Sequence, residues 1–253
     1  MTPLRARHRL GQPVTPRLRT QRAQAAAGLL PGAAPWLLLC DARDIAAAQG
    51  AAIDSWAARV GTAPTASGAL RPAVAGRGLY YGGAQRMAAA SGLIGGLSAV
   101  TSIFAASVES TTGLIWEYAT PRYFNVRGAL AGMGGATTTL TVGNGESSAG
   151  NRNTRDYAIG TGGRVVASVH DRTQAGTAEL QCYDGGEPAT ATGAFTNTTT
   201  STFAASQPMT IGSAVGGVGP ITATMHLIGF VGEALDAMTI QRLSRLVAAR
   251  LEW

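Results

Sequence analysis

The acidic residues of this sequence are the first candidates for chemistry, because paired carboxyl groups can cleave a glycosidic bond. That reaction needs two carboxyl groups roughly 5–9 Å apart, which on one face of a strand means acids two or four residues apart. Glu109 and Glu117 are separated by an expected turn, and Asp184 and Glu187 flank a Gly-Gly turn. Acids beside such turns usually serve as turn formers. The pattern predicts no glycosidase centre.

The histidines and hydroxyl residues give no clear catalytic pattern either. His8, His170 and His226 have no second ligand at metal spacing, and His170-Asp171 is predicted to be a surface pair where a strand meets a turn. A Gly-x-Ser-x-Gly elbow is absent, and a phosphate loop ending in Gly-Lys is excluded because the chain has no lysine. A Ser-His-Asp arrangement of distant residues stays open. The sequence predicts a protein that is not an enzyme, with no catalytic residue, metal or cofactor.

Two further groups of residues could bind ligands. Polar side chains of the kind that bind Ca²⁺ lie close together in one segment, but their spacing matches no defined loop, so a solvated loop is expected. These are Asn144, Glu146, Asn151, Asn153 and Asp156. Aromatic side chains at a rim or face could stack on sugars, although most are expected to pack in the core. These are Tyr80, Tyr81, Trp116, Tyr118 and Tyr123.

The net positive charge of the chain is concentrated in its N-terminal segment. The formal net charge is +6, from 20 basic and 14 acidic residues. Residues 2–22 contain six arginines and no acid, so the rest of the chain is neutral. The six are Arg5, Arg7, Arg9, Arg17, Arg19 and Arg22. We interpret this segment as a partner-binding arm rather than as the mark of a basic domain.

The arm is predicted to be extended. Its arginines alternate at period two in two short runs, and its three prolines disfavour a helix. Such a strip could lie in an acidic groove of a neighbouring protein or add a strand to its sheet. Nucleic-acid binding is the alternative, since six arginines could neutralise up to about six phosphates. The arm lacks interleaved aromatic residues, which favours a protein partner over nucleic acid.

No targeting or membrane segment is expected. The chain contains no run of about 18 apolar residues. A lipoprotein cleavage box at Cys40 would need a small residue before it, but Leu39 is large, and Pro31 and Pro35 interrupt the apolar stretch. Cys40 and Cys182 are expected to be free thiols, with a single disulfide left open.

The elements that must position these residues are mainly strands. β-branched and aromatic residues between glycine turns predict strands in residues 36–40, 76–83, 100–108, 113–120, 137–145, 164–171, 177–187, 209–214 and 223–232. Asn144-Gly145 and Asp184-Gly185 are predicted turns. A helical turn is predicted within 44–59. From Ala234 the apolar spacing is helical, with Asp236 or Thr239 as the cap.

The order of these segments resembles the concanavalin A-like and laminin-G-like jelly-roll modules of phage structural proteins and bacterial surface proteins. The matching pieces run from WLLLCDARD through GRGLYYGG and VVASVHDRTQAGTAELQCYDGGE to IGFVGEALDAMTIQRLSRLVAARLEW; strands in 121–160 could not be matched. The resemblance implies an all-β, two-sheet antiparallel jelly-roll sandwich with a short C-terminal helix. We therefore expect an extended basic arm and linker over residues 1–34 and one jelly-roll domain over residues 35–253.

The fold alone does not fix a function, because it carries lectins, glycosidases and scaffolds. The main hypothesis is a non-enzymatic virion structural protein, attached to a phage capsid or tail by its arm and part of a homo-oligomeric or larger assembly. The alternative is a carbohydrate-binding module for glycans on a host surface. Other virion proteins and host glycans are thus the expected partners, and the virion is the expected location.

Overall fold

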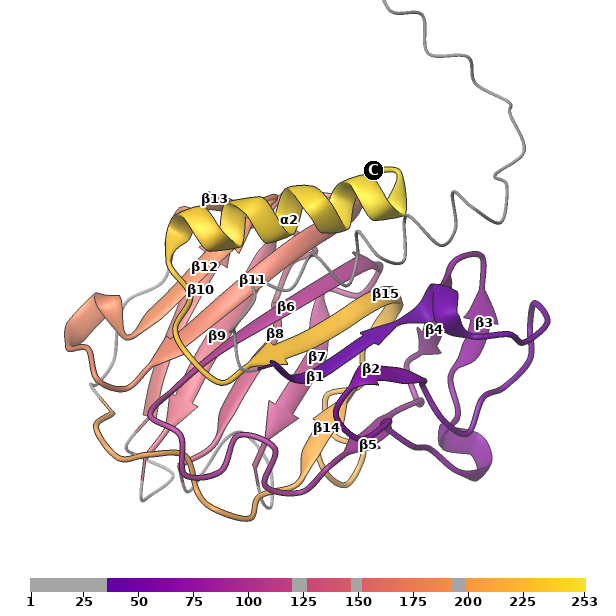
Figure 1. Cartoon of the computed structure of the whole chain (residues 1–253), viewed down its shortest axis with the longest axis horizontal. Helices are drawn as coiled ribbons and strands as arrows, with labels where there is room; N and C mark the ends of the chain where they lie inside the picture. Colours follow the sequence, from indigo (N-terminus) through magenta and orange to yellow (C-terminus); the bar gives the residue numbers. More distant parts are fainter. Residues whose placement is uncertain (1–35, 120–126, 147–151, 193–198) are drawn as a thin grey trace, which may run out of the picture. The chain divides into compact units, whose positions relative to one another are not determined.

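A computed structural model describes residues 36–119, 127–146, 152–192 and 199–253 (Figure 1). These residues form two antiparallel sheets, three short 3₁₀ helices (Ala42–Asp44, Gly68–Leu70 and Gly176–Ala178) and the C-terminal helix α2 (Ala237–Leu251). The predicted all-β sandwich with a C-terminal helix is confirmed. Among the described residues, no helix is long and apolar enough to cross a membrane.

The first sheet provides the face that α2 covers. Its described strands follow the order β13 (Glu187–Pro188), β12 (Leu180–Asp184), β11 (Gly163–Asp171), β6 (Ala99–Val108), β15 (Thr222–Val231), β1 (Trp36–Asp41) and β2 (Ala58–Val60). β4 (Gly78–Gly82) also pairs with β15, and β3 (Ala73–Ala75) pairs with β4. The register of β15 shifts between Met225 and Leu227, at the point where its neighbour on one edge changes from β4 to β1.

The second sheet closes the sandwich. Its order is β10 (Arg152–Ala158), β9 (Thr139–Gly145), β8 (Ala129–Gly134), β7 (Thr112–Tyr118), β14 (Met209–Ile211) and β5 (Met87–Ala89). Beyond β10, an isolated bridge pairs Tyr157 with Ala191. The chain that leaves β13 therefore crosses the rim of the sandwich and lies beside β10.

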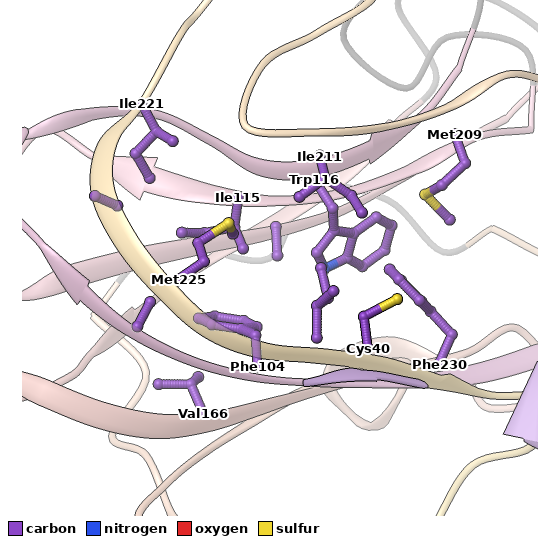
Figure 2. Packing of buried hydrophobic residues seen from close by; sticks show 14 of the residues in the cluster. Cys40, Phe104, Ile115, Trp116, Val166, Met209, Ile211, Ile221, Met225 and Phe230 are labelled. Atoms are coloured by element: carbon purple, nitrogen blue, oxygen red, sulfur yellow. The ribbon is translucent and has the colours of Figure 1, made fainter. Parts of the chain in front are cut away.

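The core lies between the sheets and follows the alternation of their strands. Figure 2 shows Trp116 of β7 pointing across the sandwich toward Cys40 and Phe230 of the first sheet. The Trp116 and Phe230 rings meet edge to face with centroids 5.2 Å apart. Cys40 and Cys182 are both buried and free, as predicted. Burial, together with the charges of nearby Asp44 and Asp41, raises the pKa of the Cys40 thiol to about 12, so this thiol is neutral and unreactive.

Helix α2 covers the outer face of the first sheet (Figure 1). It is capped by Asp236, whose side chain accepts a 2.8 Å hydrogen bond from the backbone N–H of Thr239. The sequence had left these two residues open as the cap. The helix buries one apolar stripe, Ile240, Leu243, Val247 and Leu251. That stripe meets buried residues that alternate away from the core, such as Val165 and Val169 of β11.

A cluster of charges fixes the end of α2 to β1. Asp41 is 1% exposed, and its carboxylate lies 2.5 Å from Arg250 Nε of α2 and 3.3 Å from Arg43. Arg59 of β2 lies 3.7 Å from the same carboxylate and 2.5 Å from Asp44. Asp41 therefore joins the helix, the first strand and the sheet edge in one contact network.

Gly186 allows the β12–β13 hairpin to touch α2. Its φ is +93°, and an added Cβ would lie 2.8 Å from Gln241 Cα in the helix backbone. We expect Gly186→Ala to lower the free energy of unfolding by about 2–3 kcal/mol, from backbone strain plus this clash. The adjacent Gly185→Ala is a matched control, because its φ is +61° but nothing lies within 4 Å. Equal losses in urea unfolding would show that the contact with α2 is unimportant.

Two local predictions were wrong, and one segment had been left without a match. Residues 44–59 contain no α-helical turn, because the 3₁₀ helix ends at Asp44 and isolated bridges and β2 follow. Asn144-Gly145 is not a turn, because both residues lie in β9 opposite β10. Residues 121–160, where strands could not be matched to the resemblance, contain the predicted strand β9 and two strands that were not predicted, β8 and β10, whose small and polar residues carry little β signal.

Candidate functional site

The six arm arginines, Arg5, Arg7, Arg9, Arg17, Arg19 and Arg22, lie outside the described residues. Their role in partner binding stays a prediction. Tyr123, considered for sugar stacking, and Asn151, considered for Ca²⁺ binding, also lie outside the described residues.

The carboxylates considered for glycosidase chemistry have structural surroundings. Asp184 lies 2.7 Å from Arg164 and accepts a hydrogen bond from the backbone N–H of Gly160 at 2.9 Å. Glu187 is exposed and accepts from Gln241 of α2 at 2.6 Å. Glu117 is fully buried in β7. The Asp184 side chain thus contacts Arg164 of β11 and the loop before β11 rather than the Gly-Gly turn that it precedes.

A chain of hydrogen bonds through serine, histidine and asparagine side chains, which are residue types found in catalytic triads, lies inside the sandwich. Ser168 Oγ is 3.1 Å from His170 Nε2, and His170 Nδ1 is 2.8 Å from Asn144 Oδ1. On the other side, Ser168 is 2.7 Å from Ser102, which accepts from Trp116 Nε1 at 3.1 Å. The order resembles a nucleophile–base–orienting triad. Ser168 and His170 are 0% exposed, however, so a substrate cannot reach them. This chain of hydrogen bonds satisfies buried polar groups.

His170 was predicted to be a surface residue, and this was wrong. The alternation of β11 turns it toward the core, where it meets the Trp116 ring with centroids 5.2 Å apart. Asp171 does form the expected turn, because its side chain accepts from the backbone N–H of Thr173 at 3.0 Å. Burial, reinforced by the charge of Arg172, lowers the pKa of His170 to about 3.

The buried His170 makes stability depend on pH. The unfolded chain protonates histidine near pH 6.5, whereas the folded chain does so near pH 3. Its contribution to stability is therefore complete above about pH 6.5 and is lost as the pH falls toward 3. We expect the free energy of urea unfolding to decrease from pH 6.5 to 4.5, and His170→Asn to remove most of that slope. His226→Asn, at a partly buried ring, should retain most of it. An imidazole NMR signal of His170 that titrates near pH 6.5 would contradict this.

The prediction that Asn144 and Asn153 lie in a solvated loop was wrong. Asn144 and Asn153 are fully buried in β9 and β10, and their amides donate to the Glu179 carboxylate at 2.8 and 3.1 Å. Glu179 is 0% exposed and also accepts from the backbone N–H of Thr199 at 2.9 Å. Asp156 accepts from Thr141 at 2.6 Å. No group of three potential metal-binding side chains is found among the described residues.

Arg172 ties three segments together beside this buried cluster. Its guanidinium donates to the carbonyl oxygen of Ser201 at 2.6 Å, to that of Gly128 at 3.1 Å and to that of Gly145. It also lies 3.7 Å from Glu146 and 4.5 Å from the centroid of the Phe203 ring. The side chain is fully buried. It therefore holds one end of the sandwich in a fixed arrangement.

The aromatic residues considered for sugar stacking mostly pack in the core, as expected. Tyr81, Trp116 and Tyr118 are fully buried, and Tyr80 is partly exposed. Trp253, which the sequence did not suggest for stacking, is 44% exposed and meets His226 edge to face at 5.0 Å.

An open groove lies at the rim where β10 faces β12. Its volume is about 200 Å³. Three of its walls are β10, the 3₁₀ turn before β12, and β12 itself, and the rim-crossing segment after β13 forms the fourth. It is lined by Arg155, Tyr157, Thr177, Leu180, Gln181, Cys182, Tyr183, Pro188, Ala189 and Ala191. We call this feature the rim groove.

The polar side chains of the rim groove are held in place. Gln181 donates to the carbonyl oxygen of Ala178 at 3.2 Å and accepts from the Tyr183 hydroxyl at 2.8 Å. Arg155 donates to the carbonyl oxygen of Thr177 at 3.1 Å, and its guanidinium carbon lies 5.5 Å from the Tyr157 ring centroid. The Tyr157 hydroxyl donates to the carbonyl oxygen of Leu180. Burial raises the pKa of Tyr157, so the hydroxyl stays protonated.

The sequence analysis missed this groove. Its best signal was the parity of RNTRDYA, residues 152–158, in which Arg155 shares a face with Asn153 and Tyr157. That signal required knowing that the segment is a strand.

Comparison with known proteins establishes the fold and nothing finer. No family model matches the sequence, and no curated protein matches it. Among solved structures, a Trypanosoma rangeli sialidase shares 11% identity over 92% of this chain and 38% of its own, with a TM-score of 0.56. The CBM40 module of a Ruminococcus gnavus IT-sialidase, bound to alpha2,3 sialyllactose, shares 12% sequence identity over 58% of this chain and 83% of its own, with a TM-score of 0.45.

A SAP-like pentraxin from Limulus polyphemus shares 16% identity over 57% of this chain and 69% of its own, with a TM-score of 0.43. The likeness to the Trypanosoma rangeli sialidase supports the predicted jelly-roll fold and nothing beyond the fold. The resemblance to phage structural proteins stays a prediction.

Proposed function

We propose that the jelly-roll domain is a non-enzymatic saccharide-binding module and that the rim groove is its binding site. The observation that carries this proposal is the groove itself, with fixed polar side chains beside tyrosines and a proline. Sugars are recognised by such combinations, because they present hydroxyl groups for hydrogen bonds and C–H faces for aromatic contact.

The size of the rim groove limits the ligand. Its volume of about 200 Å³ is below the roughly 300–1,000 Å³ of sites for drug-sized molecules. One sugar ring at the end of a glycan fits this space better than a long internal segment. Affinity for one ring is expected to be modest.

A glycan array with the full chain tests the proposal. The array should include glycans ending in sialic acid, since a Trypanosoma rangeli sialidase of this fold is known in complex with sialic acid. Thr177→Trp should obstruct the groove without disturbing the backbone carbonyl that Arg155 uses, and should reduce binding at least tenfold. Ala175→Trp, at an exposed position two residues away, is the matched control and should bind normally.

Two results would overturn the proposal. One is the absence of any bound glycan at millimolar concentration. The other is binding that survives Thr177→Trp but is lost in Trp253→Ala, which would place the site on the outer face instead.

We further propose that the module is displayed on a virion, with its basic arm docked to another structural protein. The support is the separation of six arginines from a neutral remainder of the chain. Deleting residues 1–30 should leave saccharide binding unchanged while removing the protein from assembled particles. Particles that retain the truncated protein would refute this anchoring role.

A further inference from the structure

We infer that the rim groove selects the anionic group of an acidic saccharide, a carboxylate or sulfate, and that Arg155 binds it. This inference rests on the proposed function and adds the class of ligand. The argument begins with the direction of the Arg155 side chain.

Arg155 points to the inner face of β10. Asn153 and Tyr157, two residues away on either side, both reach inward, the first to Glu179 and the second to the carbonyl oxygen of Leu180. Strand alternation gives Arg155 the same direction. Asp156, between them, turns outward to Thr141. A cation thus occupies a position on the inner face, at the open rim of the sandwich.

Arg155 has no carboxylate within 4 Å among the described residues. Seven other arginines do have such a partner, namely Arg43, Arg59, Arg71, Arg77, Arg164, Arg172 and Arg250. Arg155 Nη1 donates to the Thr177 carbonyl oxygen, and Nε is buried with no partner in the described part of the chain. Because the buried Nε cannot be reached from solvent, an anion in the groove would bind the remaining N–H groups of Nη1 and Nη2, which can form two parallel hydrogen bonds.

The neighbouring carboxylates cannot serve as this anion. Glu179 is occupied by Asn144, Asn153 and Thr199, and Asp156 lies on the opposite face. The positive charge in the groove therefore lacks a direct ion-pair partner within the described residues.

A charged residue pointing inward can also protect an edge strand from aggregation. Here the outer edge of β10 is already covered. Ala158 donates its backbone N–H to Thr190 at 2.8 Å, and Thr192 donates to Asp156 at 2.8 Å. Edge protection is thus a weaker explanation for Arg155 than ligand binding.

The test compares paired glycans on an array, with the full chain. Each pair contains a glycan with a terminal sialic acid, glucuronic acid or 6-sulfated galactose and the same glycan without the acidic group. We expect the acidic member to bind at least tenfold more strongly, and raised salt to reduce this preference. Comparing binding to the sialic acid and glucuronic acid glycans with binding to the sulfated galactose glycan distinguishes a preference for carboxylate from a preference for sulfate.

Variants assign the preference to Arg155. Arg155→Gln should abolish the preference for acidic members, and Arg155→Lys should restore part of it, because lysine retains the charge but not the planar pair of donors. Arg245→Gln, at an exposed position on α2, should leave it unchanged. Circular dichroism and thermal melting check that each variant folds.

The outcomes separate this inference from the proposed function. Glycan binding that needs an open groove but ignores the acidic group overturns the inference alone. An acidic preference that persists in a folded Arg155→Gln variant also overturns it. The absence of all glycan binding overturns both. If Arg155→Gln does not fold, a reduced preference in Arg155→Lys supports the inference and full retention of the preference contradicts it.

Discussion

Replacing Arg172 by methionine is expected to lower the free energy of unfolding by about 3–5 kcal/mol, which is a large part of the stability of a typical domain. The guanidinium satisfies the carbonyl oxygens of Ser201, Gly128 and Gly145, and methionine satisfies none of them. It also balances Glu146, which lies 3.7 Å away. Burial lowers the pKa of Arg172 to about 10, so it is charged at neutral pH and its removal leaves Glu146 unpaired.

Urea unfolding followed by circular dichroism measures this loss. Arg242→Met is the matched control, because Arg242 is exposed on α2 and should change stability by less than about 0.5 kcal/mol. If Arg172→Met does not fold, the same comparison can be made with Glu146→Gln, which removes the facing charge and should cost less. Equal stability of the Arg172 and Arg242 variants would show that the three carbonyl contacts contribute nothing.

Asp41→Asn is expected to destabilise the protein by a similar amount, about 3–5 kcal/mol, because it removes the buried carboxylate charge that three partly buried arginines share. Its carboxylate is 1% exposed and lies within 4 Å of Arg43, Arg59 and Arg250. Burial alone would raise the pKa of Asp41, but the Arg43 backbone N–H and the charges of Arg43 and Arg250 together lower it. The stability it gives is therefore present above the unfolded pKa near 3.9 and is lost at lower pH.

Asp54→Asn provides the matched control for Asp41. Asp54 also pairs with an arginine, Arg71, at 3.2 Å, but its side chain is 76% exposed. Such a pair contributes less than about 1 kcal/mol. Thermal melting should therefore separate the two variants by roughly 5–15 °C. Indistinguishable melting temperatures would contradict the role given to Asp41 in anchoring α2.

The sequence predicted the parts of the fold whose pattern is local. The strands at 100–108 and 164–171 are rich in β-branched residues, and the helix shows both an apolar stripe and a cap. The sequence did not predict contacts between residues that are distant along the chain. Glu179 gathers Asn144, Asn153 and Thr199, and that assembly depends on strand pairing across up to 35 residues.

The rim groove could not be predicted for the same reason. The role of Arg155 can be inferred only once β10 is known to lie opposite β12. The direction of its side chain follows from the strand, and the lack of a contacting carboxylate follows from the residues that surround it in the fold. The segment around it has few β-branched residues, so the strand itself carried little signal. Likewise His170 looked like a turn residue until the alternation of β11 was fixed.

One measurement tests the central claim most directly: the mapping of backbone amide NMR shifts in the full chain as the strongest array glycan is added. The account predicts that the largest shifts fall on the rim groove, at residues 155–157, 177–183 and 188–191, and that they saturate with one affinity. Shifts centred on Trp253 and His226, or no shifts at millimolar concentration of any glycan tested, would contradict it.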